Sequence, residues 1–210
     1  MKNNLPMQPG RRRALHTFAA LAALPLLAAG LAGCAPSKPA FKSIDLTGAD
    51  YAQGFALADA DGRQRTLKDF AGKAVVVFFG FTQCPDVCPT SLTELAEVKR
   101  LLGPQGDKLQ AVFISVDPER DTPALLKAYM GNFDPTFVAL RPTPEQLAQL
   151  AKDFKLYYKK VEGKTPGSYT MDHSAGSYIY DPQGRIRLYS RYGAGAETLA
   201  SDIRLLLEAA

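Results

Sequence analysis

Two cysteines, Cys84 and Cys88, have the spacing and surroundings expected of thiol chemistry. They lie between an apolar run, Val75 to Phe79, and a predicted helix. The unpaired amides and the dipole at a helix N-terminus favour negative charge, which lowers the pKa of a nearby thiol. A spacing of four residues brings two side chains to one side of a helical turn. The two sulfurs are therefore predicted to share one metal ion or one disulfide.

Two signals compete for the first residue of that helix. Pro89 suits the first helical position, whereas Ser91 and Glu94 form a Ser-x-x-Glu capping box. Either signal starts the helix next to Cys88.

His173 is the candidate nitrogen ligand. The other histidine, His16, falls in the export signal described below. Because His173 lies far along the chain from Cys88, folding must bring the two segments together. Taken alone, such a histidine is more often an ordinary surface or loop residue than a ligand. Asp172 and Ser174 beside it do not predict a hydrolytic triad, because adjacent residues project in different directions.

The N-terminus is predicted to be a lipoprotein signal peptide over residues 1–33. It contains four basic residues and no acidic one, and an apolar run extends from Phe18 to Ala32. Its end, Leu31-Ala32-Gly33-Cys34, resembles the lipobox of bacterial lipoproteins, so Cys34 is the expected lipidation site. Residues 34–50 are then a lipid-anchored tether, since Pro, Ser, Lys and Ala dominate its first part.

The alternative for the N-terminal segment is an uncleaved transmembrane helix. Its apolar run is only somewhat shorter than the ~20 residues that a spanning helix needs. Both interpretations hold the remaining chain at a membrane and outside the cytoplasm. We expect the periplasmic side of a bacterial inner membrane.

Length and charge restrict the class of protein. The 210 residues favour one domain plus appendages. The chain has 25 basic and 21 acidic residues, so losing the four basic residues of the signal makes the two numbers equal. A nucleic-acid partner is not expected, because it would need a basic stripe in the mature domain.

The rest of the chain alternates strand and helix patterns. Strands are predicted at Phe55–Asp59, Arg65–Leu67, Val75–Phe79, Leu109–Val116, Phe137–Leu140, Leu156–Val161, Ser177–Tyr180 and Arg185–Tyr189. Helices are predicted at Leu92–Leu102, after Thr122-Pro123, at Thr143–Phe154 and after Gly195. This order predicts an α/β sandwich with a mixed sheet flanked by helices, preceded by a β-hairpin, in one domain over residues 51–210.

Three motifs resemble those of the SCO/SenC family, in the family's order. They are Cys84-Pro-Asp-Val-Cys88-Pro89, Ser115-Val-Asp-Pro-Glu-Arg-Asp-Thr-Pro123 and Asp172-His173-Ser174. The resemblance covers most of residues 51–208 and implies a thioredoxin-like fold. It also implies a membrane-tethered copper protein that helps to assemble the CuA centre of cytochrome c oxidase. In that family the two cysteines and the later histidine bind copper, which here means Cys84, Cys88 and His173.

The donor set agrees with that implication. Two thiolates and one imidazole form a soft site that suits Cu(I) or Cu(II). Zinc usually takes four ligands in a structural site, and a fourth would have to come from Asp86 or water. Copper is therefore the expected metal. The expected partners are the CuA-bearing oxidase subunit, a periplasmic copper donor and a thiol reductant.

A disulfide between Cys84 and Cys88 is expected in the oxidised, metal-free protein. As a structural staple it would contribute only roughly 2 kcal/mol, because the closed loop is short. A reversible dithiol suits an exported pair better. The pair would then be the catalytic cysteines of a thiol-disulfide oxidoreductase, which is the alternative function. Whether the protein is an enzyme therefore stays open.

A thiol peroxidase is a third possibility, since the Phe55–Thr82 region also resembles peroxiredoxin-like domains. Both enzyme hypotheses leave His173 without a role. Three residues separate the cysteines, whereas thioredoxins have two.

The remaining motif residues have less specific interpretations. Asp121 and Thr122 are predicted to cap the helix that follows them, and an Asp117–Arg120 pair is the alternative that would hold this loop near the metal. Three aromatic residues are expected to be core or metal-shielding residues rather than a docking face: Phe78, Phe79 and Phe81.

Overall fold

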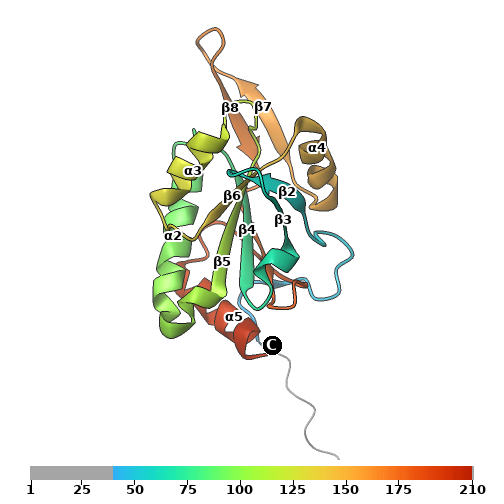
Figure 1. Cartoon of the computed structure of the whole chain (residues 1–210), viewed down its shortest axis with the longest axis vertical. Helices are drawn as coiled ribbons and strands as arrows, with labels where there is room; N and C mark the ends of the chain where they lie inside the picture. Colours follow the sequence, from blue (N-terminus) through green and yellow to red (C-terminus); the bar gives the residue numbers. More distant parts are fainter. Residues whose placement is uncertain (1–39, 210) are drawn as a thin grey trace, which may run out of the picture. The chain divides into compact units, whose positions relative to one another are not determined.

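The computed structural model describes residues 40–209, and its centre is an eight-stranded mixed sheet in the order β1-β10-β9-β4-β5-β6-β2-β3 (Figure 1). The sheet strands are β1 (Ile44–Asp45), β2 (Ala56–Asp59), β3 (Gln64–Thr66), β4 (Ala74–Gly80), β5 (Leu109–Ser115), β6 (Val138–Arg141), β9 (Ser177–Tyr180) and β10 (Ile186–Ser190). A second sheet contains only β7 (Tyr158–Glu162) and β8 (Tyr169–His173).

Helices cover the sheet on both sides. They are α2 (Val87–Leu101), α3 (Pro123–Gly131), α4 (Pro144–Asp153), α5 (Ala196–Glu208) and the short 3₁₀ segments η2 (Leu67–Phe70) and η3 (Gly103–Lys108). Figure 1 shows α2 and α3 on one side of the strands and α4 on the other. The predicted α/β sandwich with a mixed sheet and an N-terminal hairpin, β2–β3, is confirmed.

The centre of the sheet explains the apolar runs in the sequence. Strands β4 and β5 pair in parallel, and every residue of both is buried. Strand β9 pairs antiparallel with the other edge of β4. Both faces of these strands are covered by helices or loops. The sequences of the strands are therefore predominantly apolar and do not alternate between apolar and polar residues.

Helix α2 begins earlier than predicted. Its first residue is Val87, so Pro89 is its third residue, and the expected capping box of Ser91 and Glu94 does not start the helix. The first turn tolerates Pro89 because the N–H groups there have no intrahelical partner. The first backbone bond runs from the Thr90 amide to the Asp86 carbonyl, at 3.1 Å. Cys88 therefore lies within the first turn.

The β7–β8 ribbon differs most from the sequence expectation. The sequence predicts a strand at Leu156–Val161 but no partner for it, and it predicts no strand that contains His173. Strand β8 pairs antiparallel with β7, with His173 opposite Tyr158. The ribbon has many exposed polar residues and one well-buried residue, Met171. Its sequence therefore lacks the apolar alternation by which a strand is recognised.

The beginning of the described chain is fastened to the last helix. Asp202 of α5 is fully buried and accepts hydrogen bonds from the amides of Lys42 (2.9 Å) and Ser43 (2.8 Å). Strand β1 then pairs with β10 at the sheet edge. These contacts hold residues 42–45 against the last helix and the edge of the sheet.

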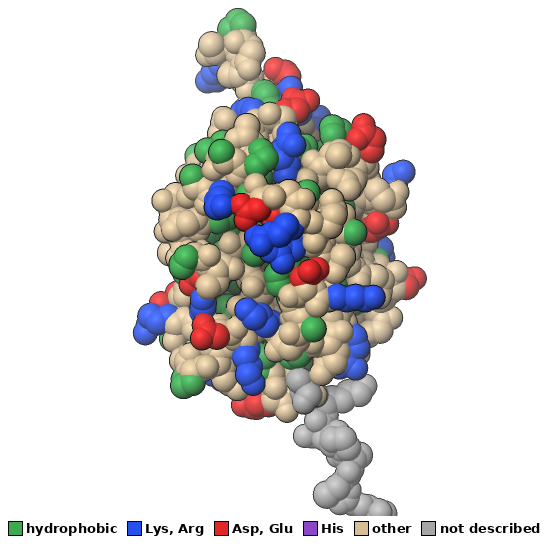
Figure 2. Space-filling view, viewed as in Figure 1, with side chains coloured by type: hydrophobic (Ala, Val, Ile, Leu, Met, Phe, Trp, Pro, Cys, Tyr) green, Lys and Arg blue, Asp and Glu red, His purple; other side chains and the backbone are tan. Residues whose placement is uncertain are grey.

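No helix within residues 40–209 is long and apolar enough to cross a membrane. The predicted signal over residues 1–33 and the lipidation site Cys34 lie outside the described residues. On the face drawn in Figure 2, basic and acidic side chains are interspersed rather than gathered by sign.

Candidate metal centre

The two cysteines lie where β4 passes into α2. After Gly80 the chain turns, and the Cys84 amide bonds to the Phe81 carbonyl at 3.2 Å. Cys88 in the first turn of α2 is fully buried, whereas Cys84 is half-buried. The Cys88 amide donates to the Cys84 sulfur at 3.4 Å. An amide at a helix N-terminus therefore points at the more accessible sulfur, as the sequence predicted.

His173, the last residue of β8, meets the cysteines. Its Nε2 lies 3.6 Å from the Cys88 sulfur, and the ligand atoms of Cys84, Cys88 and His173 all lie within 4.8 Å of one another. Its Nδ1 lies 2.9 Å from the Ser174 carbonyl oxygen, which only accepts. Nδ1 therefore donates to this carbonyl, and Nε2 is the ring nitrogen that faces the sulfurs.

Aromatic rings enclose the imidazole. The rings of Phe78 and Phe81 meet it edge-on, with centroids 6.2 and 5.9 Å away. Both residues are buried, as is Phe79, which packs on Phe154 instead. The prediction that the three phenylalanines belong to the core is confirmed, and two of them also shield the site from water.

The two thiols differ in acidity. The hydrogen bond from Cys88 lowers the pKa of Cys84 to about 4, against the opposing effect of burial, and the bond to His173 adds to the lowering. The same hydrogen bond, followed by burial, raises the pKa of Cys88. At neutral pH the metal-free pair is thus one accessible thiolate and one buried thiol. Metal binding must remove the proton of Cys88.

Gly80 leaves space for the Cys88 sulfur because it has no side chain, a role that sequence reasoning missed. A Cβ added at Gly80 would lie 2.8 Å from that sulfur and 2.7 Å from the Phe113 ring. The sulfur thus packs against the backbone at the end of β4. In the sequence, Gly80 only follows an apolar run, and its tertiary neighbours Cys88 and Phe113 come from other segments.

The second motif supports the cysteine loop. Thr122 caps α3 as predicted, with its hydroxyl accepting from the Leu125 amide at 3.3 Å. The prediction that Asp121 also caps this helix is wrong. Asp121 is fully buried and accepts from the hydroxyls of Thr82 (2.6 Å) and Ser115 (2.5 Å), and burial raises its pKa. It joins the start of the cysteine loop to the end of β5. Asp117 and Arg120 form the expected pair.

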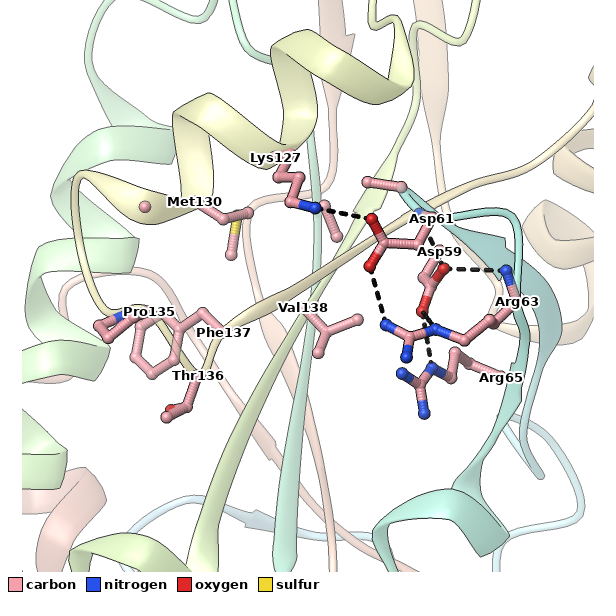
Figure 3. A pocket seen from close by; sticks show the side chains of 13 residues that line it. Asp59, Asp61, Arg63, Arg65, Lys127, Met130, Pro135, Thr136, Phe137 and Val138 are labelled. Carbon is pink, nitrogen blue, oxygen red and sulfur yellow. Dashed lines mark hydrogen bonds and ion pairs between the residues drawn. The ribbon is translucent and has the colours of Figure 1, made fainter.

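Charged side chains line a pocket at the β2–β3 turn, and the ion pairs among them explain why they gather there (Figure 3). Its ion pairs are Arg65–Asp59 (2.8 Å), Arg63–Asp61 (2.8 Å) and Lys127–Asp61 (2.7 Å). Each of these charges has an opposite partner, so the network fastens the hairpin to α3.

Comparison with known proteins agrees with the motifs. The sequence model of SCO1/SenC matches residues 45–208. The bovine protein named SCO2 homolog, mitochondrial, is 38% identical over 152 residues, which cover 71% of this chain and 57% of the relative. The chain thus spans less than two thirds of that relative's length.

Solved structures show the same fold. ScoI of Bradyrhizobium japonicum with copper bound is 44% identical, with a TM-score of 0.66, and the match covers 73% of this chain and 97% of that one. A SCO1/SenC family lipoprotein from Bacillus anthracis is 26% identical, with a TM-score of 0.62 and coverage of 73% and 92%. The predicted thioredoxin-like arrangement agrees with these neighbours.

Proposed function

Because the chain belongs to the SCO1/SenC family, we propose that it is a copper chaperone that supplies the CuA centre of cytochrome c oxidase. The ligands would be Cys84, Cys88 and His173. One observation carries the proposal: segments far apart in sequence place two sulfurs and an imidazole nitrogen within 4.8 Å of one another.

The donors fit copper better than zinc. Among the described residues, these three side chains form the one group of His, Cys, Asp and Glu ligand atoms close enough to hold an ion. Asp86, the residue considered for a fourth position, is exposed and outside this group. Three soft ligands without a fourth suit copper, whereas a structural zinc site usually has four.

The site is also open enough to release its metal. A hollow lined by Phe81, Cys84, Val87, Tyr157 and His173 leads to the ligands from outside. Incoming thiolates of an oxidase subunit would replace the ligands one at a time, beginning with the accessible Cys84. Such an exchange moves copper without a net redox change. Loading requires the reduced dithiol, so a copper donor and a thiol reductant are proposed partners.

Copper titration tests this function. Residues 40–210 form a compact unit, and in reduced form this unit is expected to bind one copper ion with thiolate-to-copper charge-transfer absorption. The oxidised protein, with Cys84 and Cys88 in a disulfide, is expected to bind none, because a disulfide offers no thiolate. Equal binding by the two forms would contradict the proposal.

The second candidate is a thiol-disulfide oxidoreductase acting on the target's cysteines. The acidic, accessible Cys84 beside the protonated, buried Cys88 favours it, since this is the division expected of an attacking and a resolving thiol. Rapid turnover of a disulfide or peroxide by metal-free protein would place this candidate or a thiol peroxidase first.

For the N-terminus we propose a signal over residues 1–33, lipidation at Cys34, and a tether that ends before Lys42. The segment predicted as a tether, 34–50, is thus shortened, because its residues 42–45 already contact α5 and β10. The Bacillus anthracis lipoprotein of the same family supports this arrangement. In a bacterial host, Cys34→Ser is expected to lose labelled palmitate and to keep its uncleaved signal. A wild-type protein that carries no lipid and stays in the inner membrane would instead indicate the transmembrane helix.

A further inference from the structure

Arg120 connects three separate segments around the metal centre. It lies in the loop between β5 and α3 and pairs with Asp117 in the same loop. Its Nη1 donates to the Gln83 side-chain oxygen at 3.0 Å, beside Cys84. The same nitrogen donates to the Tyr169 carbonyl at 2.9 Å, on the strand that ends at His173. One guanidinium therefore touches both the cysteine loop and the histidine strand.

Tyr169 is held from several directions. The Arg120 guanidinium lies 3.6 Å from its ring centroid, and Lys160 of β7 lies 3.9 Å from the same centroid. The Tyr169 hydroxyl donates to Asp117 at 2.9 Å. A guanidinium that stacks on a ring while donating from both Nε and Nη1 depends on the planar fork of arginine, which lysine does not reproduce.

The β7–β8 ribbon depends on such side-chain contacts for its position. Its strands pair only with each other, whereas the other described strands belong to the large sheet. Figure 1 shows the ribbon extending beyond the body of the domain. An isolated two-stranded ribbon is marginally stable in water. The rings of Phe78 and Phe81 contact His173 at its own end of β8, and its location relative to the sulfurs depends also on what fastens β8 at the other end.

We propose that Arg120 is a positioning residue of the metal centre, which fastens the His173 strand to the cysteine loop through Tyr169 and Gln83. The proposal deepens the proposed function and rests on it for its copper readout. Loss of Arg120 separates the imidazole from the sulfurs and leaves the two cysteines in place, because they belong to the β4–α2 junction.

Arg120→Met in the full chain is the main test. Copper affinity is expected to fall by roughly 10–100-fold, as for loss of other groups that orient a ligand. Copper should remain bound by sulfur alone. The electron-nuclear double-resonance spectrum of the Cu(II)-loaded variant should then lack the signal of the histidine nitrogen. Adding His173→Ala to Arg120→Met should then cost little further affinity, although His173→Ala alone weakens binding. Independent, additive losses would overturn the proposal.

A second readout needs no metal. In the metal-free wild type, the His173 ring should show proton contacts in NMR spectra with the rings of Phe78 and Phe81, which it meets edge-on. Arg120→Met and Arg120→Lys should both lose these contacts. The matched control is Arg100→Met, which removes an exposed arginine paired with Glu97 and should keep them. Contacts retained in Arg120→Met would overturn the positioning role.

Milder variants keep the test valid if Arg120→Met does not fold. Gln83→Ala removes one exposed partner, and Tyr169→Phe removes only the hydroxyl bond to Asp117. Each should weaken the ring contacts of His173 partially, and unchanged contacts in both would contradict the proposal. A wild type that binds no copper but keeps these contacts would refute the proposed function, while the metal-free comparison would still decide the role of Arg120.

Discussion

Cys88→Ser is expected to lower copper affinity by more than the ~10–100-fold that loss of an outer-shell partner costs. The Cys88 sulfur is fully buried and lies 3.6 Å from His173 Nε2, so it is the donor most enclosed by the site. A serine hydroxyl is a hard, neutral donor that holds its proton, and it does not replace a thiolate for copper. Competition between the reduced variant and a Cu(I) chelator measures the loss.

The companion variants define the ligand set. Cys84→Ser and His173→Ala are each expected to weaken binding as well, since each leaves two of the three donors. Thermal unfolding of the metal-free variants is the control, because a change confined to the ligand should leave their midpoints near that of wild type. Equal copper retention by wild type and His173→Ala would count heavily against the site.

Gly80→Ala should impair both the fold and the metal centre. Its Cβ would lie 2.8 Å from the Cys88 sulfur and 2.7 Å from the Phe113 ring, closer than real Cβ contacts allow, and 3.0 Å from the Phe78 ring. Overpacking a core costs about 1–3 kcal/mol, and here the strain is relieved by moving the sulfur or the rings around His173. We expect a lower midpoint of thermal unfolding together with weaker copper binding.

Gly131→Ala is the matched control. Gly131 ends α3, and a Cβ there would meet no atom within 4 Å. Alanine has a higher helix propensity than glycine, so the free energy of unfolding of this variant is expected to rise by at most about 1 kcal/mol. Its copper binding should equal that of wild type. A Gly80→Ala protein that behaves like Gly131→Ala would show that the close packing of the Cys88 sulfur is unimportant.

Most of the fold could be predicted because local signals mark its elements. The Thr122-Pro123 and Thr143-Pro144 pairs do start α3 and α4, since a capping hydroxyl followed by proline acts within a single turn. The start of α2 could not be predicted in this way. There the chain leaves a buried strand, and packing at that junction rather than a side-chain cap decides the first turn.

Only those site residues that belong to recognisable sequence motifs could be predicted. The two cysteines and His173 stood out by type and by family resemblance, and the structure brings them together. The contribution of Tyr169 could not be found, because no motif contains it and its importance comes from contacts with Arg120 and Asp117. Likewise, Asp121 looked like a helix cap in sequence, whereas its carboxylate reaches back to another loop.

The burial of Asp202 links the beginning and the end of the described domain. Its carboxylate in α5 accepts hydrogen bonds from the backbone amides of Lys42 and Ser43, next to the edge strand β1. Because both donors are backbone groups, exchanging the side chains at positions 42 and 43 keeps the link, whereas losing the Asp202 carboxylate removes it. The last helix and the first strand are therefore expected to detach together when the domain opens locally.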